Sequence, residues 1–149
     1  MLSQLDGRGI RVVELGGESG RASALKMTYA AMTKGTAALR TALLVAAHRL
    51  GVYDTLCDEF QKSQPAAFSQ MQNSIRRLPT VAHRWIGEME EIASTFEVVG
   101  VTPNFHRGAA DMFRLVELAD LARNEDLEDL ILRDAIAALA ALDDRRRST

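Results

Sequence analysis

The sequence predicts a mostly all-α protein, a helical bundle around one long N-terminal helix that is preceded by a single short strand. Two observations support this prediction. From residue 21 onward the pattern of apolar residues is helical almost throughout. The segment 21–50 is also dominated by alanine, the strongest helix former, and by other small residues. Such a helix lets others approach closely, so it suits the centre of a bundle or a subunit interface.

The strand is expected at residues 10–15. This segment is short, contains β-branched residues and is flanked by glycines. One strand cannot form a sheet. It must therefore pair with a second chain, or the rest of its sheet must belong to a part of the protein outside this sequence. Both readings suggest that the chain is a fragment or the second half of something larger.

Helix boundaries follow from local signals. Two signals mark the end of the first helix. Gly51 suits the position just after a helix, and His48 and Arg49 lie where positive charge stabilises a helix C-terminus. Prolines favour the first turn of a helix, so Pro65, Pro79 and Pro103 each indicate a helix start. Asn124 is a good N-cap for the last helix, because acidic residues follow it in the first turn. The expected helices are 21–50, 53–61, 65–76, 79–100, 103–122 and 124–142.

Composition narrows the function classes. The 149 residues are 47% apolar and 26% charged with a net charge of −2, which argues against nucleic acid or an anionic membrane as partner. No apolar run is long enough to span a membrane. Cys57 is the only cysteine, so no intrachain disulfide can form and a cytoplasmic location is expected. The three histidines lack ligand spacing, so no metal site is expected.

The most informative segment contains one lysine in an apolar run. Lys26 follows a glycine-rich turn, and no carboxylate lies between Glu18 and Asp54. Lys26, Tyr29 and Thr33 are spaced i, i+3 and i+7, which stacks them on one helix face. The face is either the ordinary edge of a helix or one wall of a cleft with a placed proton donor. Spacing alone favours the helix edge.

Three stretches resemble the β-hydroxyacid dehydrogenases, the superfamily of 6-phosphogluconate dehydrogenase, and more closely its phosphogluconate-dehydrogenase-like subgroup. They are ASALKMTYAAMTKG (22–35), RWIGEMEEIA (84–93) and GVTPNFHRGAA (100–110), and the resemblance covers roughly residues 8–120. Gly20 fits the first glycine of the lysine motif, and Ala22 replaces the second. Ala30 stands where an asparagine usually contacts substrate, so 6-phosphogluconate itself is not assigned.

The resemblance implies an NAD(P)-dependent oxidoreductase acting on a small hydroxyacid. Residues 1–20 would be the remnant of the last strand and turn of a dinucleotide-binding domain, and residues 21–149 a helical substrate-binding and dimerisation domain. NAD or NADP would bind mainly to a domain preceding Met1, so the cofactor-binding residues are unknown and this chain alone should be inactive. A homodimer is expected, with Lys26 as catalytic acid/base and Tyr29 and Thr33 at the substrate.

Two further segments supply candidate substrate-binding residues. Arg84, Glu88 and Glu91 share one helix face, so Arg84 could bind a substrate carboxylate while a glutamate orients hydroxyls. The alternative is an ordinary Arg–Glu pair on a solvated helix. His106 could line the same cleft, although a lone histidine is more often structural.

A different class of function also fits. The small-residue helix and the unpaired strand both suggest an intermolecular surface. The chain would then be a non-catalytic helical module that self-associates or binds a partner protein.

Overall fold

The computed structural model describes residues 6–7, 9, 11–119 and 132–147. Within these ranges the chain forms α-helices and no sheet. The helices are α1 (Arg21–Arg49), α2 (Tyr53–Ser63), α3 (Pro65–Val98), α4 (Asn104–Leu118) and α5 (Leu132–Arg147). The predicted mostly all-α bundle around one long N-terminal helix is therefore confirmed.

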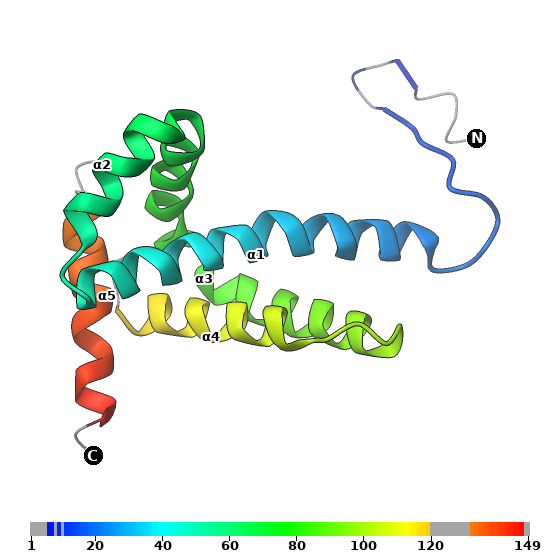
Figure 1. The fold of residues 1–149 in the computed structure, drawn as a ribbon. Coiled ribbons are helices and arrows are strands. Elements are labelled where there is room, and N and C mark those ends of the chain that lie inside the picture. Colours follow the sequence, from blue (N-terminus) through cyan, green and yellow to red (C-terminus); the bar gives the residue numbers. More distant parts are fainter. Residues whose placement is uncertain (1–5, 8, 10, 120–131, 148–149) are drawn as a thin grey trace.

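The helix α1 runs the length of the molecule, and the others pack along it or across its end (Figure 1). The second half of α3 lies antiparallel to α4, and both contact α1. The helices α2 and α5 gather at the C-terminal end of α1 together with the first half of α3. The N-terminal half of α1 is consequently covered only on the side that faces α3 and α4.

Small side chains on α1 explain this close packing. Ala31, Ala37 and Ala38 are buried where the other helices approach, and Leu44 is completely buried further along. The helix ends as predicted, at Gly51, whose φ of 71° lies in the left-handed region that glycine adopts without strain.

A single hydrophobic core joins all the helices. Its large members lie on one face of each helix, at positions that have almost no contact with solvent. They include Leu44, Leu78, Met89, Ile92, Phe113, Ile136 and Leu139. Burial of such side chains contributes about 1.5–3 kcal/mol each, which makes this core the main source of stability.

Pro79 does not start a new helix, so the prediction of two helices at 65–76 and 79–100 was wrong. The helix α3 continues through Pro79, and it changes direction near its middle in Figure 1. A proline inside a helix removes one hydrogen bond and forces a bend. Burial of Ile75, Leu78 and Ala82 on both sides of the bend keeps the chain helical.

The predicted strand at 10–15 does not form in the described residues. Residues 11–16 have no regular secondary structure, and the backbone N–H of Val12 donates instead to Oδ1 of Asp6 at 2.9 Å. A strand needs a neighbouring strand for its backbone hydrogen bonds, and residues 11–119 and 132–147 contain none. The predicted N-cap at Asn124 lies outside the described residues.

Candidate functional site

A largely buried charge in the described chain belongs to a lysine that sequence reasoning did not single out. Nζ of Lys34 on α1 forms an ion pair with Oε2 of Glu88 on α3. The Lys34 side chain is only 15% exposed and that of Glu88 33% exposed. The ammonium also lies 5.7 Å from the ring centroid of Trp85, within range of a cation–π interaction. This junction between α1 and α3 is the strongest candidate site.

Two more cations surround the pair. Nε of Arg84 lies 3.6 Å from Oε1 of Glu88. Burial lowers the pKa of Lys34, and the positive charges of Arg84 and Lys26 lower that pKa further. Lys26 lies eight residues before Lys34 on α1, which is about 12 Å along the helix axis. We call Lys26, Lys34, Arg84 and Glu88 the cation cluster.

The structure joins some of the predicted site residues and separates others. Arg84 and Glu88 are brought together as their spacing predicted, with Lys34 added from α1. His106 lies in a different place, between α1 and α4. The sequence did contain a signal for Lys34. Like Lys26 eight residues earlier, Lys34 is a cation on a helix that has no acidic residue to pair with it.

The predicted face of Lys26, Tyr29 and Thr33 is open to solvent. All three side chains are exposed, and the Thr33 hydroxyl lies within hydrogen-bonding distance of the carbonyls of Tyr29 (3.4 Å) and Ala30 (3.3 Å) of its own helix. Within this chain, Lys34 and not Lys26 is therefore the partly dehydrated ammonium.

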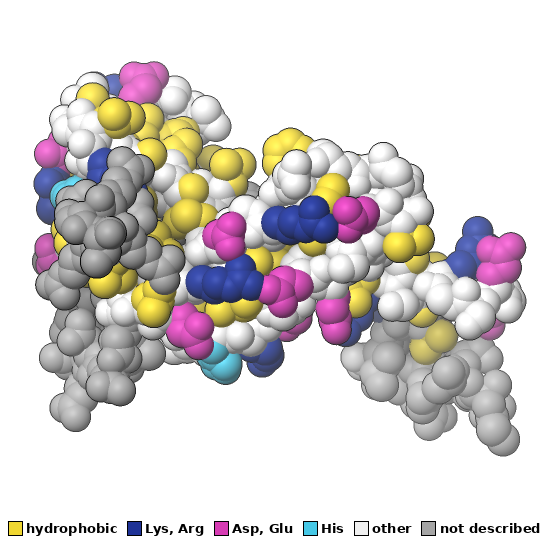
Figure 2. Space-filling model, turned by 90° about the horizontal axis from the view of Figure 1, so that it is seen from below, with side chains coloured by type: hydrophobic (Ala, Val, Ile, Leu, Met, Phe, Trp, Pro, Cys, Tyr) yellow, Lys and Arg dark blue, Asp and Glu magenta, His cyan; other side chains and the backbone are white. Residues whose placement is uncertain are grey.

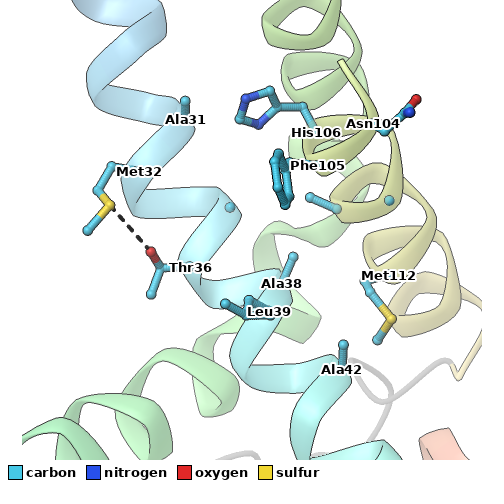
Figure 3. Close-up of a pocket in the computed structure, with 13 residues that line it drawn as sticks. Ala31, Met32, Thr36, Ala38, Leu39, Ala42, Asn104, Phe105, His106 and Met112 are labelled. Atoms are coloured by element: carbon cyan, nitrogen blue, oxygen red, sulfur yellow. Dashed lines mark hydrogen bonds between the residues drawn. The ribbon is translucent and has the colours of Figure 1, made fainter. Parts of the chain in front are cut away.

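A separate apolar groove runs between α1 and α4 (Figure 3) and has a volume of about 490 Å³. Its α1 side is made of small residues, including Ala31, Gly35 and Ala38, and its α4 side includes Phe105 and Met112. The aromatic ring of Phe105 is 79% exposed. One wall of this groove is therefore lined by small residues, and the other carries a large exposed ring.

His106 lines this groove but is itself only 8% exposed. Its ring packs edge-on against Phe96 with centroids 4.3 Å apart, and its Nδ1 atom is buried without a hydrogen-bond partner. Burial lowers the pKa of His106, so the ring is neutral at pH 7. This environment supports the structural alternative that the sequence left open for His106.

Large apolar side chains continue along the exposed side of α1. Leu25, Tyr29, Met32 and Leu39 are all more than half exposed. Positions 25, 29, 32 and 39 follow the 3.5-residue repeat by which a helix packs against another helix. We call these four residues together with Phe105 the apolar stripe.

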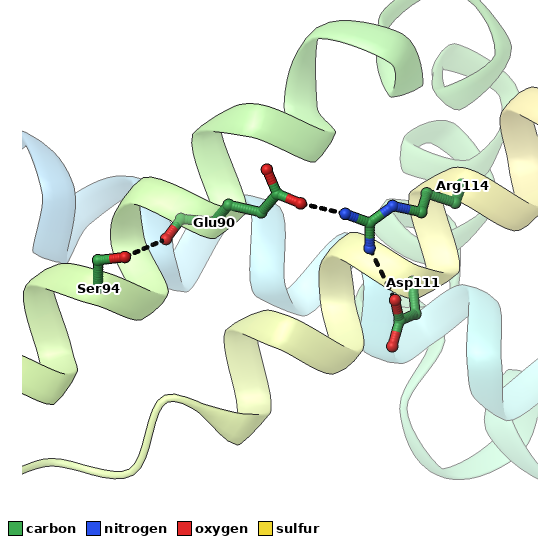
Figure 4. Close-up of polar contacts among 4 residues, drawn as sticks. All are labelled: Glu90, Ser94, Asp111 and Arg114. Atoms are coloured by element: carbon green, nitrogen blue, oxygen red, sulfur yellow. Dashed lines mark hydrogen bonds and ion pairs between the residues drawn. The ribbon is translucent and has the colours of Figure 1, made fainter.

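A third surface feature is polar and lies between α3 and α4. Arg114 forms ion pairs with Glu90 on α3 and, at 2.7 Å, with Asp111 on its own helix (Figure 4). Arg107 pairs with Glu97 at 2.7 Å. Figure 2 shows basic and acidic side chains lying side by side on this face. The pairs of Arg114 with Glu90 and of Arg107 with Glu97 join α3 to α4, and because they are exposed each contributes little to stability.

The described residues contain no group of three or more His, Cys, Asp or Glu side chains arranged to hold a metal ion. None of the helices in the described ranges has the length and apolarity needed to cross a bilayer.

Comparison with known proteins places these features in context. Residues 47–116 match DUF1932, a domain of unknown function. DUF1932 is a helical C-terminal domain found in 6-phosphogluconate dehydrogenase-like proteins. The match includes Arg84, Glu88 and His106, and it begins after the lysine segment of α1. No curated protein matches the chain.

One solved structure resembles most of the chain. It is the crystal structure of a conserved hypothetical protein from Sinorhizobium meliloti 1021, with a TM-score of 0.73 and 27% sequence identity. The similarity covers 94% of this chain but 47% of the other. The chain therefore spans about half the length of the solved protein that it matches.

Proposed function

We propose that this chain is the helical, substrate-facing half of an NAD(P)-dependent oxidoreductase that acts on a hydroxyacid. The DUF1932 match carries the proposal, because that domain occurs in proteins of the dehydrogenase-like class. The length of the Sinorhizobium protein supports a second half of similar size. The cation cluster supports an acidic substrate.

The residues of this chain would bind the substrate and move its proton. Lys26 would accept the hydroxyl proton during oxidation and return it during reduction, which requires its ammonium to be partly dehydrated. Its exposure here fits this role only when the nucleotide-binding half covers α1. Arg84 would bind the substrate carboxylate through its forked donors, with Glu88 fixing its orientation.

A nicotinamide cofactor supplies the hydride acceptor when it is bound. The described residues include no strand followed by a glycine-rich turn of the kind that holds a dinucleotide. We therefore propose that NAD or NADP is bound mainly by another domain and that the chain alone is inactive.

The test is to join the chain to a nucleotide-binding half and to measure NAD(P)H formation with a panel of hydroxyacids. Lys26→Ala should lower kcat by at least ~10²-fold, the usual contribution of an acid/base residue. Lys62→Ala, at an exposed lysine on α2, is the matched control. An unchanged rate in Lys26→Ala would remove the proposed mechanism.

A second candidate function, self-association, is favoured by the apolar stripe. Its five residues are each more than half exposed, and burial of such apolar surface is what stabilises a contact between subunits. The same face holds a projecting ring, Phe105, and a groove walled by small residues. A two-fold dimer needs such self-complementarity, so we propose a second copy of this chain as the occupant.

Analytical ultracentrifugation tests the dimer directly. Leu39→Lys puts a charge within the apolar stripe and should shift the chain to monomer, whereas Val98→Lys, at a more exposed valine outside the stripe, should not. Equal sedimentation of Leu39→Lys and the unmodified chain would rule out this surface.

A further inference from the structure

We propose that the groove between α1 and α4 binds a small uncharged molecule with an apolar body and one hydroxyl group, and that this hydroxyl forms a hydrogen bond with the imidazole of His106. Such a ligand differs from the hydroxyacid proposed above. Its site includes neither Lys26 nor Arg84, so it is separate from the proposed substrate-binding residues.

Burial divides the groove into a floor and a rim. Ala31, Ala38 and Ala109 form part of the floor, and each is at most 8% exposed. Met32 on α1 and Phe105 on α4 form part of the rim and are 71% and 79% exposed. The volume of about 490 Å³ lies within the range of about 300–1,000 Å³ that is usual for small-molecule sites. A molecule on the floor would therefore lie between large apolar side chains of both helices.

The lining of the groove favours an uncharged ligand. Among the described residues that line it, none is acidic or basic apart from His106, which is neutral at pH 7. An ionised group placed there would lose its hydration without gaining a counter-charge. An apolar body would instead be stabilised by its removal from water.

His106 supplies a polar contact within this apolar surface. Figure 3 shows its imidazole reaching from α4 toward α1, near Ala31. The residue is only 8% exposed, and its Nδ1 atom is buried without a hydrogen-bond partner in the described chain. An unpaired buried nitrogen is energetically unfavourable. A ligand that pairs with this nitrogen would recover part of that cost.

A hydroxyl group suits this imidazole because it can both donate and accept a hydrogen bond. In a neutral ring one nitrogen donates and the other accepts, so a hydroxyl fits Nδ1 whichever nitrogen carries the proton. The torsion that orients a histidine ring is broad, and a modest rotation of the His106 ring can turn Nδ1 toward the groove. A carboxylate can only accept, and it carries a charge that the lining does not neutralise.

A second copy of the chain could cover this ligand without taking its place. Met32, Leu39 and Phe105 belong both to the groove and to the apolar stripe. A copy that rests on the stripe would close the rim and leave the floor to the ligand. A copy that fills the groove would instead exclude the ligand, and binding measurements distinguish these two cases.

The probes are 4-ethylphenol and ethylbenzene, which share an apolar body and differ by one hydroxyl group. Titration of the full chain, labelled with nitrogen-15 and followed by NMR at pH 7, should shift backbone amide signals of α1 and α4 and the ring nitrogen signals of His106. We expect 4-ethylphenol to bind at least about 10-fold more tightly than ethylbenzene. Ethylbenzene is the more apolar probe, so non-specific adsorption to hydrophobic surface would give the opposite order.

Variants locate the binding. His106→Leu should reduce the preference for 4-ethylphenol to less than about 2-fold. Gly35→Leu fills the groove, because Gly35 lines it and has open space where a Cβ would stand, and it should weaken both probes by about 10-fold or more. Gly87→Leu, at a helical glycine with similar space outside the groove, should change neither. The glycine pair keeps the test valid if circular dichroism shows that His106→Leu is unfolded.

Equal or tighter binding of ethylbenzene would overturn the proposal, as would equal affinity of Gly35→Leu and the unmodified chain. Absence of binding would overturn it too. If sedimentation then showed a dimer, the groove would be assigned to the second copy, and self-association would be retained. The titration uses neither cofactor nor turnover, so the ligand site and the catalytic role of Lys26 can fail separately.

Discussion

The ammonium of Lys34 on α1 and the carboxylate of Glu88 on α3 form an ion pair that is mostly withdrawn from solvent. The pair joins the long helix to the bent one, beside Trp85 and Arg84. Glu88 thus pairs with a largely buried cation on α1 and with an exposed one on its own helix.

Glu88→Gln should lower the free energy of unfolding by about 1–2 kcal/mol, since it leaves the Lys34 charge partly buried without a counter-charge. Partial exposure of both side chains keeps the loss below that of a fully buried pair. Urea denaturation of Glu88→Gln, Lys34→Met and the double variant gives the coupling energy. Additive losses in the two single variants would show that the residues do not interact.

His106 should make the fold sensitive to acid. Burial lowers its pKa below the ordinary value of 6.5, so the unfolded chain binds the proton more readily than the folded one. The contribution to stability is present above pH 6.5 and is lost as the pH falls toward the lowered value. Chemical denaturation between pH 4.5 and pH 8 measures the free energy of unfolding as a function of pH. His106→Leu should reduce the slope of that dependence. The same slope in that variant and the unmodified chain would assign acid sensitivity to other groups.

Gly35 and Gly87 provide a matched pair for the groove. Both are helical glycines with open space where a Cβ would stand, so alanine at either should stabilise the folded monomer by about 0.5–1 kcal/mol. Of these two glycines, Gly35 lines the groove between α1 and α4 and Gly87 does not. Gly35→Ala should therefore weaken self-association, whereas Gly87→Ala should leave it intact. Thermal melting and sedimentation at several concentrations separate the two effects, and equal dimerisation of both variants would argue against a groove-centred interface.

Arg114→Met should lower stability by less than about 1 kcal/mol, although it removes two ion pairs at once. The three ion-paired side chains drawn in Figure 4 are between 43% and 74% exposed, so water and salt screen the attraction between them. Urea denaturation of the variant and the unmodified chain at low and high salt measures this loss of stability. A loss well above 1 kcal/mol would show that the α3–α4 contact depends on this arginine.

Local sequence predicted much of the architecture. The start of α1 after Gly20, its end before Gly51 and the start of α2 at Tyr53 follow from residue preferences that act within one or two turns. The one-turn spacing of Arg84 and Glu88 likewise predicted their contact. Such features need no knowledge of which helices meet.

Interactions between distant segments decided the rest. Pro79 predicts a helix start by local rules, but burial of the residues around it carries α3 through the bend. Residues 10–15 favour a strand, but the described part of the chain has no neighbouring strand to accept their hydrogen bonds.

The sequence by itself determined that the chain is helical, where most of its helices begin, and that Lys26 has no acid on its own helix. Only the tertiary structure decided that Lys34 meets Glu88, and that His106 is buried in an apolar groove while Lys26 remains exposed. The physical reason is that helix formation depends on neighbours along the chain, whereas dehydration and pairing of a charge depend on which surfaces pack together.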